Sequence, residues 1–490
     1  MEQIDSNEIV LRDEQIEGET NTQLMRRLGL YFLGNISAKL VSMLLTRLQT
    51  YFLTPMSFGD VTMVLNAIPL LISFCFMEIW SGVLKFMFER EDEEGKRQII
   101  TNGFAIALMM VPLFLVVGTM LGLYGGTQYI PYILIYGFLY LLDYIYQFGA
   151  RGLGFNKLFA ITGIVSTAVI GVVQILCLAV FDLGDLSLLI SPAVAALVSV
   201  LIYESKTKQL RKARFSQVDW KIMKRMTRFA IPLAFNAIAF FALTVVNQFI
   251  ISAMAGSSEV GLYNAAGRIS SIVNLLVTVF SLAWQETAFS LNKMEGRAGY
   301  YSITLERYVT IIGMAVLVGI PFSYIIFPWF IDASFQSSWT LLPASLLFAA
   351  MAALTNYMGH IFSSENLTKH LTISTAVAAA VNILTVVLLL PLIGLQAGYI
   401  ALTLGFTVNF VYRMIYIQKY LKITFAWKRA LLYVALIAAA VWLYFNLPNR
   451  SSYWVFLGVT IVVALIILWR DIKPIFAKLK ALIGSMRGKK

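Results

Sequence analysis

Six ionisable side chains lie inside stretches of the chain that are otherwise apolar. They are the bases Lys39, Arg47 and Arg268 and the acids Glu78, Asp143 and Glu286. A charge at the centre of a lipid bilayer costs about 2.5 to 3.5 kcal/mol on insertion scales, so such residues face protein or water and mark functional sites. Guanidinium groups bind phosphates through paired, charge-assisted hydrogen bonds, while intramembrane carboxylates carry protons or sodium ions. These residue types therefore indicate anion binding and cation coupling.

The two arginines are expected at the same depth in the membrane. Arg47 lies about two turns below the outer end of the first apolar stretch, and Arg268 lies about two turns into a later stretch that also starts outside. Two cations that face one cavity would together bind a phosphate or pyrophosphate. In the alternative interpretation, Asp143 and Glu286 neutralise them as internal salt bridges, although both acids are expected nearer the cytoplasmic half. Both interpretations stay open from the sequence.

The remaining interior charges have two interpretations as well. Lys39 and Glu78 are expected near mid-membrane on consecutive antiparallel stretches, so they are candidates for a structural ion pair. Asp143 and Glu286 are candidates for the coupling group, or for helix-end carboxylates satisfied by their neighbours. No set of His, Cys, Asp and Glu has metal-ligand spacing, and no glycine-rich phosphate loop follows a strand. We therefore expect no metal site, no cofactor and no ATP-driven step.

Membrane-spanning helices must position these side chains. The 490-residue chain is 59% hydrophobic and 13% charged, which lies outside the range of soluble domains. Apolar runs long enough to cross about 30 Å of hydrocarbon recur along it. The predicted spans are 28–52, 60–85, 98–123, 129–150, 158–181, 186–204, 229–253, 261–288, 304–330, 339–361, 371–391, 395–417, 429–446 and 453–469. The predicted fold is an all-α polytopic membrane protein with about 14 transmembrane helices.

The basic residues set the orientation of these spans. Of the 38 Lys and Arg residues, 34 fall in the segments or span ends on one side of the alternating spans, and only Arg450 falls on the other side. Lys and Arg accumulate on the cytoplasmic side, so an even number of spans places both termini in the cytoplasm. The basic segment 205–228 is expected to face anionic lipids and not nucleic acid, because juxtamembrane Lys and Arg clusters bind the cytoplasmic leaflet.

The same segment divides the first twelve spans into six and six. A faint internal repeat, 53–68 against 255–269, is what a two-lobed transporter built by duplication would show. The predicted organisation is an acidic cytoplasmic tail (1–27), an N-lobe (28–204), a basic linker (205–228), a C-lobe (229–417), two further helices (418–469) and a basic cytoplasmic tail (470–490).

Three short segments resemble one family of transporters. They are YFLTPMSFGDV (51–61), SSEVGLYNAAGRISSI (257–272) and AWQETAFS (283–290). Together with the order of spans over about 26–417, they resemble the Wzx-type polysaccharide flippases of the multidrug/oligosaccharidyl-lipid/polysaccharide exporter superfamily. The resemblance implies two pseudo-symmetric six-helix lobes around a central cavity, two additional C-terminal helices and alternating access.

The resemblance also implies a function. Members move undecaprenyl-(pyro)phosphate-linked oligosaccharides from the inner to the outer leaflet of the bacterial cytoplasmic (inner) membrane, for the biosynthesis of surface polysaccharides. The family's cationic cavity residues carry over by position to Arg47 and Arg268, and in third place to Lys39. The three interior acids depart from a purely cationic cavity and bring its net charge to zero. A polysaccharide polymerase and glycosyltransferases are candidate partners.

Two other classes of protein are alternatives to a flippase. A cation-coupled multidrug exporter of the same fold typically has an acid in its first span, whereas this chain has Lys39 and Arg47 there and no acid. A membrane polymerase or glycosyltransferase needs a large outer loop or a cytoplasmic nucleotide-sugar domain, and every predicted outer loop here is short. We therefore expect a flippase and not an enzyme.

Overall fold

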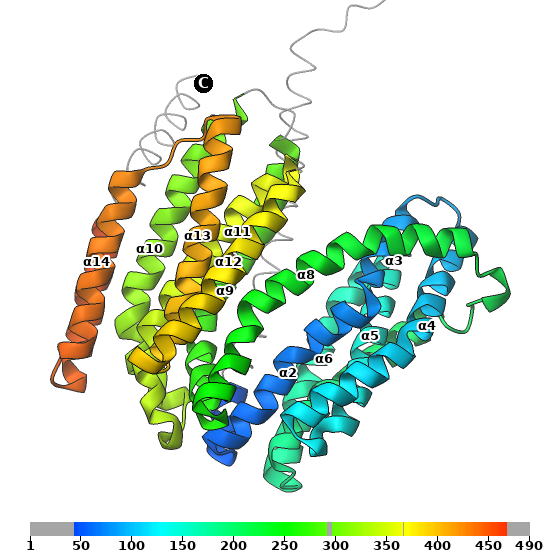
Figure 1. The fold of residues 1–490 in the computed structure, drawn as a ribbon, viewed down its shortest axis with the longest axis horizontal. Helices are drawn as coiled ribbons and strands as arrows, with labels where there is room; N and C mark the ends of the chain where they lie inside the picture. Colours follow the sequence, from blue (N-terminus) through cyan, green and yellow to red (C-terminus); the bar gives the residue numbers. More distant parts are fainter. Residues whose placement is uncertain (1–43, 292–295, 366, 468–490) are drawn as a thin grey trace, which may run out of the picture. The chain divides into compact units, whose positions relative to one another are not determined.

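The computed structural model describes residues 44–291, 296–365 and 367–467, and no strand occurs among them. The main helices are α2 (Pro55–Phe76), α3 (Ile79–Phe88), α4 (Glu93–Gly125), α5 (Ile130–Gly152), α6 (Asn156–Ile175), α7 (Ser187–Thr207), α8 (Trp220–Ala255), α9 (Ser257–Leu291), α10 (Arg297–Phe330), α11 (Leu342–Ser364), α12 (Thr368–Ile393), α13 (Gln396–Leu421) and α14 (Trp427–Asn446) (Figure 1). Residues 44–52 and 450–467 are also helical. Short helical turns are η1 (Thr127–Tyr129), η2 (Leu176–Val180), η3 (Gly184–Leu186), η4 (Phe215–Gln217) and η5 (Ala333–Leu341).

The length and composition of these helices fit a multi-pass membrane protein. The described residues contain 11 helices that are long and apolar enough to cross a bilayer, or 12 if α8 counts as one bent span. This confirms the predicted all-helical membrane fold. The predicted count of 14 stays a prediction, and most of its first span, 28–52, lies outside the described residues.

The described residues form two compact units. Unit 1 comprises the chain up to Val245 together with Asn274–Ser290, and unit 2 comprises Val246–Val273 and the chain from Leu291 onward. Both α8 and α9 therefore contribute residues to each unit. The boundaries predicted for the two lobes, the linker and the tails stay predictions.

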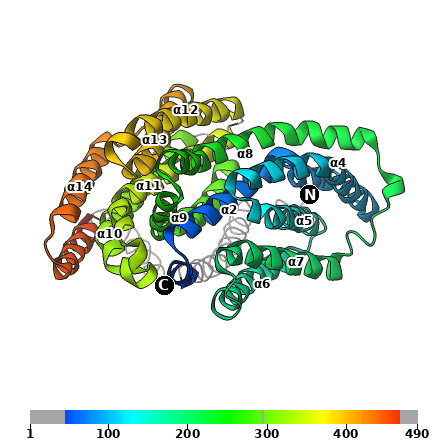
Figure 2. The same cartoon turned by 60° about the horizontal axis from the view of Figure 1, so that its bottom comes forward.

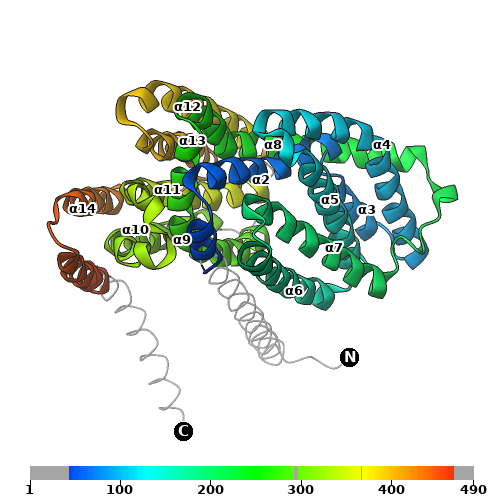
Figure 3. The same ribbon diagram turned by 90° about the horizontal axis from the view of Figure 1, so that it is seen from below.

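Unit 1 is organised around α5. This helix packs against α3, α4 and α7, while α2 packs on α4 and α6 on α7 (Figure 3). Close approach of α4 and α5 depends on Gly137, because a Cβ there would lie 2.9 Å from the Phe114 ring. Such small-residue contacts let helix backbones approach closely where hydrocarbon supplies no hydrophobic driving force.

Unit 2 is a second helical bundle. In it α12 lies along α13, α11 packs on α13, and α10 packs on α11 and α14 (Figure 2). The last turns of α8 join this bundle through a buried amide pair, in which Asn247 Nδ2 donates to Asn382 Oδ1 (3.2 Å) and Asn382 Nδ2 donates back to Asn247 Oδ1 (2.7 Å). Asn247 also donates to the Gly398 carbonyl (2.9 Å). A reciprocal amide pair satisfies polar groups that would be costly to bury alone.

Candidate functional site

The predicted second span, 60–85, was wrong as one continuous helix. The backbone breaks between α2 and α3, where Met77 and Glu78 have φ of 52° and 54°. Two consecutive non-glycine residues in the left-handed region cost roughly 1 to 2 kcal/mol each, so the surrounding structure must hold them there. The freed groups are partly satisfied, since Met77 N–H donates to Ser73 O (3.1 Å) and Ser81 N–H to Glu78 O (2.9 Å).

The break changes the surroundings expected for Glu78. This residue caps the start of α3 and does not lie mid-helix, and its Oε1 accepts a hydrogen bond from Ser73 Oγ (2.9 Å). Strained backbone at a carboxylate is typical of ion and substrate sites. Its predicted partner Lys39 lies outside the described residues, so the Lys39–Glu78 pair stays a prediction.

An aromatic ladder runs along one face of α5. Tyr136, Tyr140, Tyr144 and Phe148 follow one another at four-residue spacing, which aligns side chains on a helix. Their ring centroids are separated in turn by 5.8, 4.7 and 6.1 Å, and Tyr140 Oη donates to Tyr144 Oη (3.0 Å). Trp80 of α3 contacts the ladder, with its ring 5.0 Å from that of Tyr144. All four ladder side chains are half-buried.

Asp143 lies next to this ladder. Its Oδ1 is buried and has no hydrogen-bond partner among the described residues. Both Asp143 and Glu78 interact electrostatically with Tyr144. The structure of unit 1 therefore brings two of the predicted carboxylates to one aromatic surface, which we call the α3–α5 cluster: Glu78, Trp80, Tyr136, Tyr140, Asp143, Tyr144 and Phe148.

The α3–α5 cluster offers two kinds of chemistry. Aromatic rings present flat apolar faces, and tyrosine hydroxyls both donate and accept hydrogen bonds. A carboxylate inside a membrane-spanning helix, such as Asp143, can carry a proton or a sodium ion. Within the described residues, no three His, Cys, Asp or Glu side chains come together to hold a metal ion.

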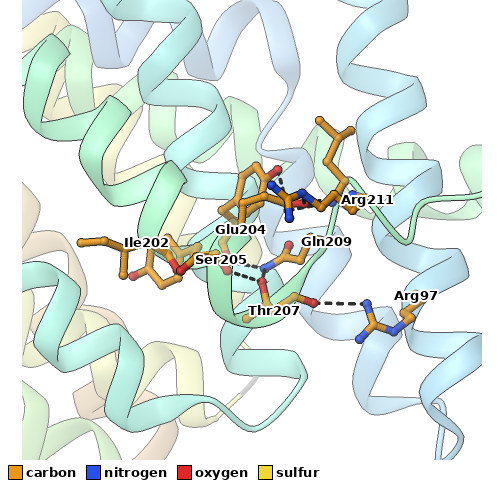
Figure 4. Close-up of polar contacts among 10 residues, drawn as sticks. Arg97, Ile202, Glu204, Ser205, Thr207, Gln209 and Arg211 are labelled. Carbon is orange, nitrogen blue, oxygen red and sulfur yellow. Dashed lines mark hydrogen bonds and ion pairs between the residues drawn. The ribbon is translucent and has the colours of Figure 1, made fainter.

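Tyr146 does not belong to the ladder. It lies on another face of α5, where its hydroxyl donates to Glu204 Oε2 (3.0 Å). Figure 4 shows the surrounding network, in which Gln209 Nε2 donates to the Tyr146 carbonyl (2.9 Å) and Glu204 accepts from the backbone N–H groups that follow α7. Tyr146 therefore ties α5 to the end of α7.

Arg47 lies in the helical segment 44–52 of unit 1 and is half-buried. Thr50 Oγ1 on the following turn donates to the carbonyls of Thr46 (3.0 Å) and Arg47 (3.3 Å). These contacts satisfy hydroxyl groups within the helix itself, as is usual for threonine in apolar spans.

Arg268 lies in the part of α9 that belongs to unit 2. The preceding residue, Gly267, lets the Tyr399 hydroxyl approach the helix, since a Cβ at Gly267 would lie 2.7 Å from it. That hydroxyl donates to the Tyr263 carbonyl (2.8 Å), and Tyr399 also interacts electrostatically with Arg268. Among the described residues the half-buried Arg268 guanidinium has no carboxylate or hydrogen-bond partner. Its donors are therefore available for an anion.

Two other predicted site residues have no described side chain. Lys39 precedes the described residues altogether. Glu286 belongs to α9, but its side chain lies outside what the structure describes. Their assignment to phosphate binding and coupling stays a prediction.

Sequence reasoning missed a buried arginine in unit 2. Arg413 of α13 is 4% exposed, and it donates from Nε to Ser374 Oγ (2.9 Å), from Nη1 to Thr355 O (2.9 Å) and from Nη2 to Thr375 Oγ1 (3.1 Å). These three hydrogen-bond partners are neutral. Because Arg413 lies near the end of predicted span 395–417, it was counted with the cytoplasmic charges. The adjacent hydroxyls of Ser374 and Thr375 in span 371–391 could have indicated hydrogen-bond acceptors for a buried polar side chain.

A comparison with protein families identifies the chain. The model of a family described as "Polysaccharide biosynthesis protein" matches residues 24–284, which is more than half of the chain. The chain belongs to this family. The matched region includes Arg47, Arg268 and the whole α3–α5 cluster. No curated protein matches the sequence.

Solved structures show the fold of this polysaccharide biosynthesis protein. One is titled as the lipid II flippase MurJ in an inward closed conformation, with a TM-score of 0.67 and 15% identity over 90% of this chain and 98% of that one. Another is titled as an inward-facing multidrug resistance MATE family transporter of the MOP superfamily, with a TM-score of 0.64 and 13% identity over 84% and 98%. A mutant of the Vibrio cholerae MATE transporter VcmN has a TM-score of 0.55 and 14% identity over 82% and 97%. The family protein thus has the MOP-superfamily fold.

Proposed function

We propose that this protein is a flippase that moves an undecaprenyl-(pyro)phosphate-linked oligosaccharide from the cytoplasmic to the outer leaflet by alternating access. The α3–α5 cluster is the observation that carries the proposal. Its ladder offers ring faces and hydroxyls that suit sugar rings, and two carboxylates adjoin it. The family description and the fold shared with a lipid II flippase support the same function.

Each part of the substrate has a proposed contact. Arg268 and Arg47, with Lys39 in third place, bind the phosphate groups, because arginine binds phosphate bidentately. The α5 ladder contacts the sugars, and the polyprenyl chain stays in lipid. Asp143, Glu78 and Glu286 couple transport to an ion gradient.

The proposed location follows from the charge distribution. The protein resides in a bacterial cytoplasmic membrane with both termini in the cytoplasm, since most of its basic residues fall on one side of the predicted spans. A polysaccharide polymerase and glycosyltransferases are proposed partners, because they would consume and supply the lipid-linked glycan.

The direct test is a leaflet assay in proteoliposomes. A fluorescent polyprenyl-pyrophosphate oligosaccharide is placed in one leaflet, and its exposure to a membrane-impermeant quencher is followed over time. We expect transfer by the wild type at a rate at least tenfold above that of protein-free vesicles. Transport of an organic cation with no transfer of the lipid would favour the drug-exporter alternative.

A variant pair tests the sugar contact within this assay. Tyr140→Ala with Tyr144→Ala removes two rings of the ladder, and each lost stacking partner is worth roughly 1 kcal/mol. We expect about a tenfold or larger loss of transfer for the oligosaccharide-linked lipid. Transfer of a polyprenyl pyrophosphate without sugars should change little. Equal losses for both lipids would contradict a sugar-specific ladder.

A further inference from the structure

An apolar groove lies in unit 1 between α4 and the first half of α8. Its volume is about 500 Å³. The apolar lining comes from Ile106, Met109 and Met110 of α4 and from Met223, Ile231 and Pro232 of α8. None of these residues takes part in the function proposed above.

Two cations and an indole line the same groove. Trp220, Lys224 and Arg228 follow one another at four-residue spacing on α8, so they lie on one face of the helix. All three side chains are exposed, Trp220 by 66%. Tryptophan prefers the boundary between hydrocarbon and water, and Lys and Arg near that boundary meet lipid phosphates.

These two cations differ from the neighbouring ones in their partners. Arg225, one residue along α8, pairs with Glu89 (Nη2–Oε2 3.2 Å), and Arg214 pairs with Glu94 (Nη1–Oε1 3.1 Å). Lys224 and Arg228 have no hydrogen-bond or ion-pair partner among the described residues. Their charge is therefore available to an anion outside the protein.

The groove has the depth of a single leaflet. Asp219 N–H donates to Asn102 Oδ1 (2.9 Å), and Gln98 Nε2 donates to the Gln217 carbonyl (3.1 Å), which fixes the start of α8 beside this part of α4. From Trp220 to Pro232 the helix rises about 18 Å at 1.5 Å per residue. Half of the hydrocarbon core is about 15 Å, so the groove matches the length of one acyl chain.

We propose that this groove binds an anionic phospholipid of the leaflet next to the basic segment 205–228. The phosphate contacts Lys224 and Arg228, and an acyl chain lies along Ile106, Met110 and Ile231. A phospholipid fits better than a polyprenyl carrier, because the groove is about as long as one leaflet is deep, whereas a long polyprenyl chain extends beyond that length. The proposal does not depend on the transported substrate.

A lipid bound in this groove would contact α8, which contributes residues to both units. The first half of α8 belongs to unit 1 and its last turns belong to unit 2. A lipid that contacts both α4 and α8 holds the start of α8 against unit 1. We therefore expect anionic lipid to raise the thermal stability of the purified protein.

Native mass spectrometry of the full-length protein tests the proposal directly. The protein in detergent is titrated with phosphatidylglycerol or with phosphatidylcholine, and bound lipids are counted. We expect one phosphatidylglycerol to bind well before any phosphatidylcholine. Lys224→Ala with Arg228→Ala should weaken this first binding event about thirty-fold, given the usual contribution of two basic residues near an anionic lipid. Lys221→Ala, an exposed cation on α8 outside the groove, is the matched control.

A second variant distinguishes lipid binding in the groove from a general attraction between anionic lipid and basic residues. Met109 is 56% exposed, so Met109→Trp should fold, and its larger side chain would fill the acyl-chain path. We expect it to abolish the first phosphatidylglycerol event and its thermal stabilisation while Lys224 and Arg228 remain. Unchanged binding in both groove variants would overturn the site. Displacement of phosphatidylglycerol by an equal or lower concentration of polyprenyl phosphate would overturn the assignment to phospholipid.

Discussion

At the scale of single residues, the described interior charges fall into two groups. Arg413 is surrounded by neutral hydrogen-bond acceptors and holds α11, α12 and α13 together. Asp143 has a buried oxygen without a partner in the described part of the chain, and no carboxylate there interacts with the Arg268 guanidinium. The first group stabilises the bundle, whereas the second is available to ligands. The sequence identified Asp143 and Arg268 as candidate site residues, because a charge in an apolar span is visible in any register. It could not predict Arg413 as buried, because burial depends on the neighbouring helices.

Replacement of Asp143 by asparagine separates coupling from folding. The amide keeps the shape of the side chain but cannot bind a proton or sodium ion, so we expect gradient-driven transport to fall at least tenfold and to lose its dependence on pH. Thermal stability should stay within about 1 kcal/mol of the wild type, because no hydrogen bond to Oδ1 is lost. Asp182→Asn, at an exposed turn with φ of 47° that asparagine tolerates, is the control. Normal pH-dependent transport by Asp143→Asn would move the coupling role to another acid.

For Arg413, unlike Asp143, we predict a role in stability and not in ion coupling. Arg413→Ala removes three hydrogen bonds inside the bundle and leaves the Thr355 carbonyl and two hydroxyls without their donor. We expect a loss of about 2 to 3 kcal/mol in unfolding free energy, measured by denaturant titration in detergent. Lys419→Ala, an exposed cation on the same helix, should be neutral. A stable Arg413→Ala protein that fails to transport would instead give Arg413 a direct role with the substrate.

At the scale of helices, the sequence predicted an all-helical membrane protein but not the irregularities of single helices. The α4 boundary follows from Asp92, whose carboxylate accepts from Gly95 N–H (2.6 Å), a common signal for a helix start. The break after Phe76 has no such signal, because Met77 and Glu78 are ordinary helix-forming residues. Their left-handed backbone depends on the surrounding packing, which a single sequence does not show.

Substitutions at Met77 test whether the break is a strained element. Glycine adopts positive φ without steric cost, so Met77→Gly should be neutral or stabilising by up to about 1 kcal/mol despite the loss of its side chain. Met77→Val should destabilise by about 1 to 2 kcal/mol, because a β-branched residue tolerates this conformation least. Thermal unfolding of both variants in detergent is the measurement. Equal stability of the two variants would show that residue 77 adopts an ordinary helical conformation.

At the scale of the whole molecule, composition and charge distribution were sufficient for the class of protein. The family match over 24–284 and the MOP-superfamily fold agree with the resemblance seen in three short segments. The substrate follows less directly, because related folds are found in structures titled both as lipid flippases and as multidrug transporters. Arg47 belongs to unit 1 and Arg268 to unit 2. The proposal that both arginines bind the lipid phosphates is the central claim of the proposed function.

The most direct test of this claim is the leaflet assay on the double variant Arg47→Ala with Arg268→Ala. Lys157→Ala, which removes an exposed cation outside the site, is the control, and equal insertion of all proteins is checked by protease protection. We predict that the double variant loses at least 100-fold in transfer of the pyrophosphate-linked oligosaccharide, since charge-assisted hydrogen bonds contribute roughly 1.5 to 3 kcal/mol each. Transfer at the wild-type rate by a normally inserted double variant would contradict the account and place the phosphate site elsewhere.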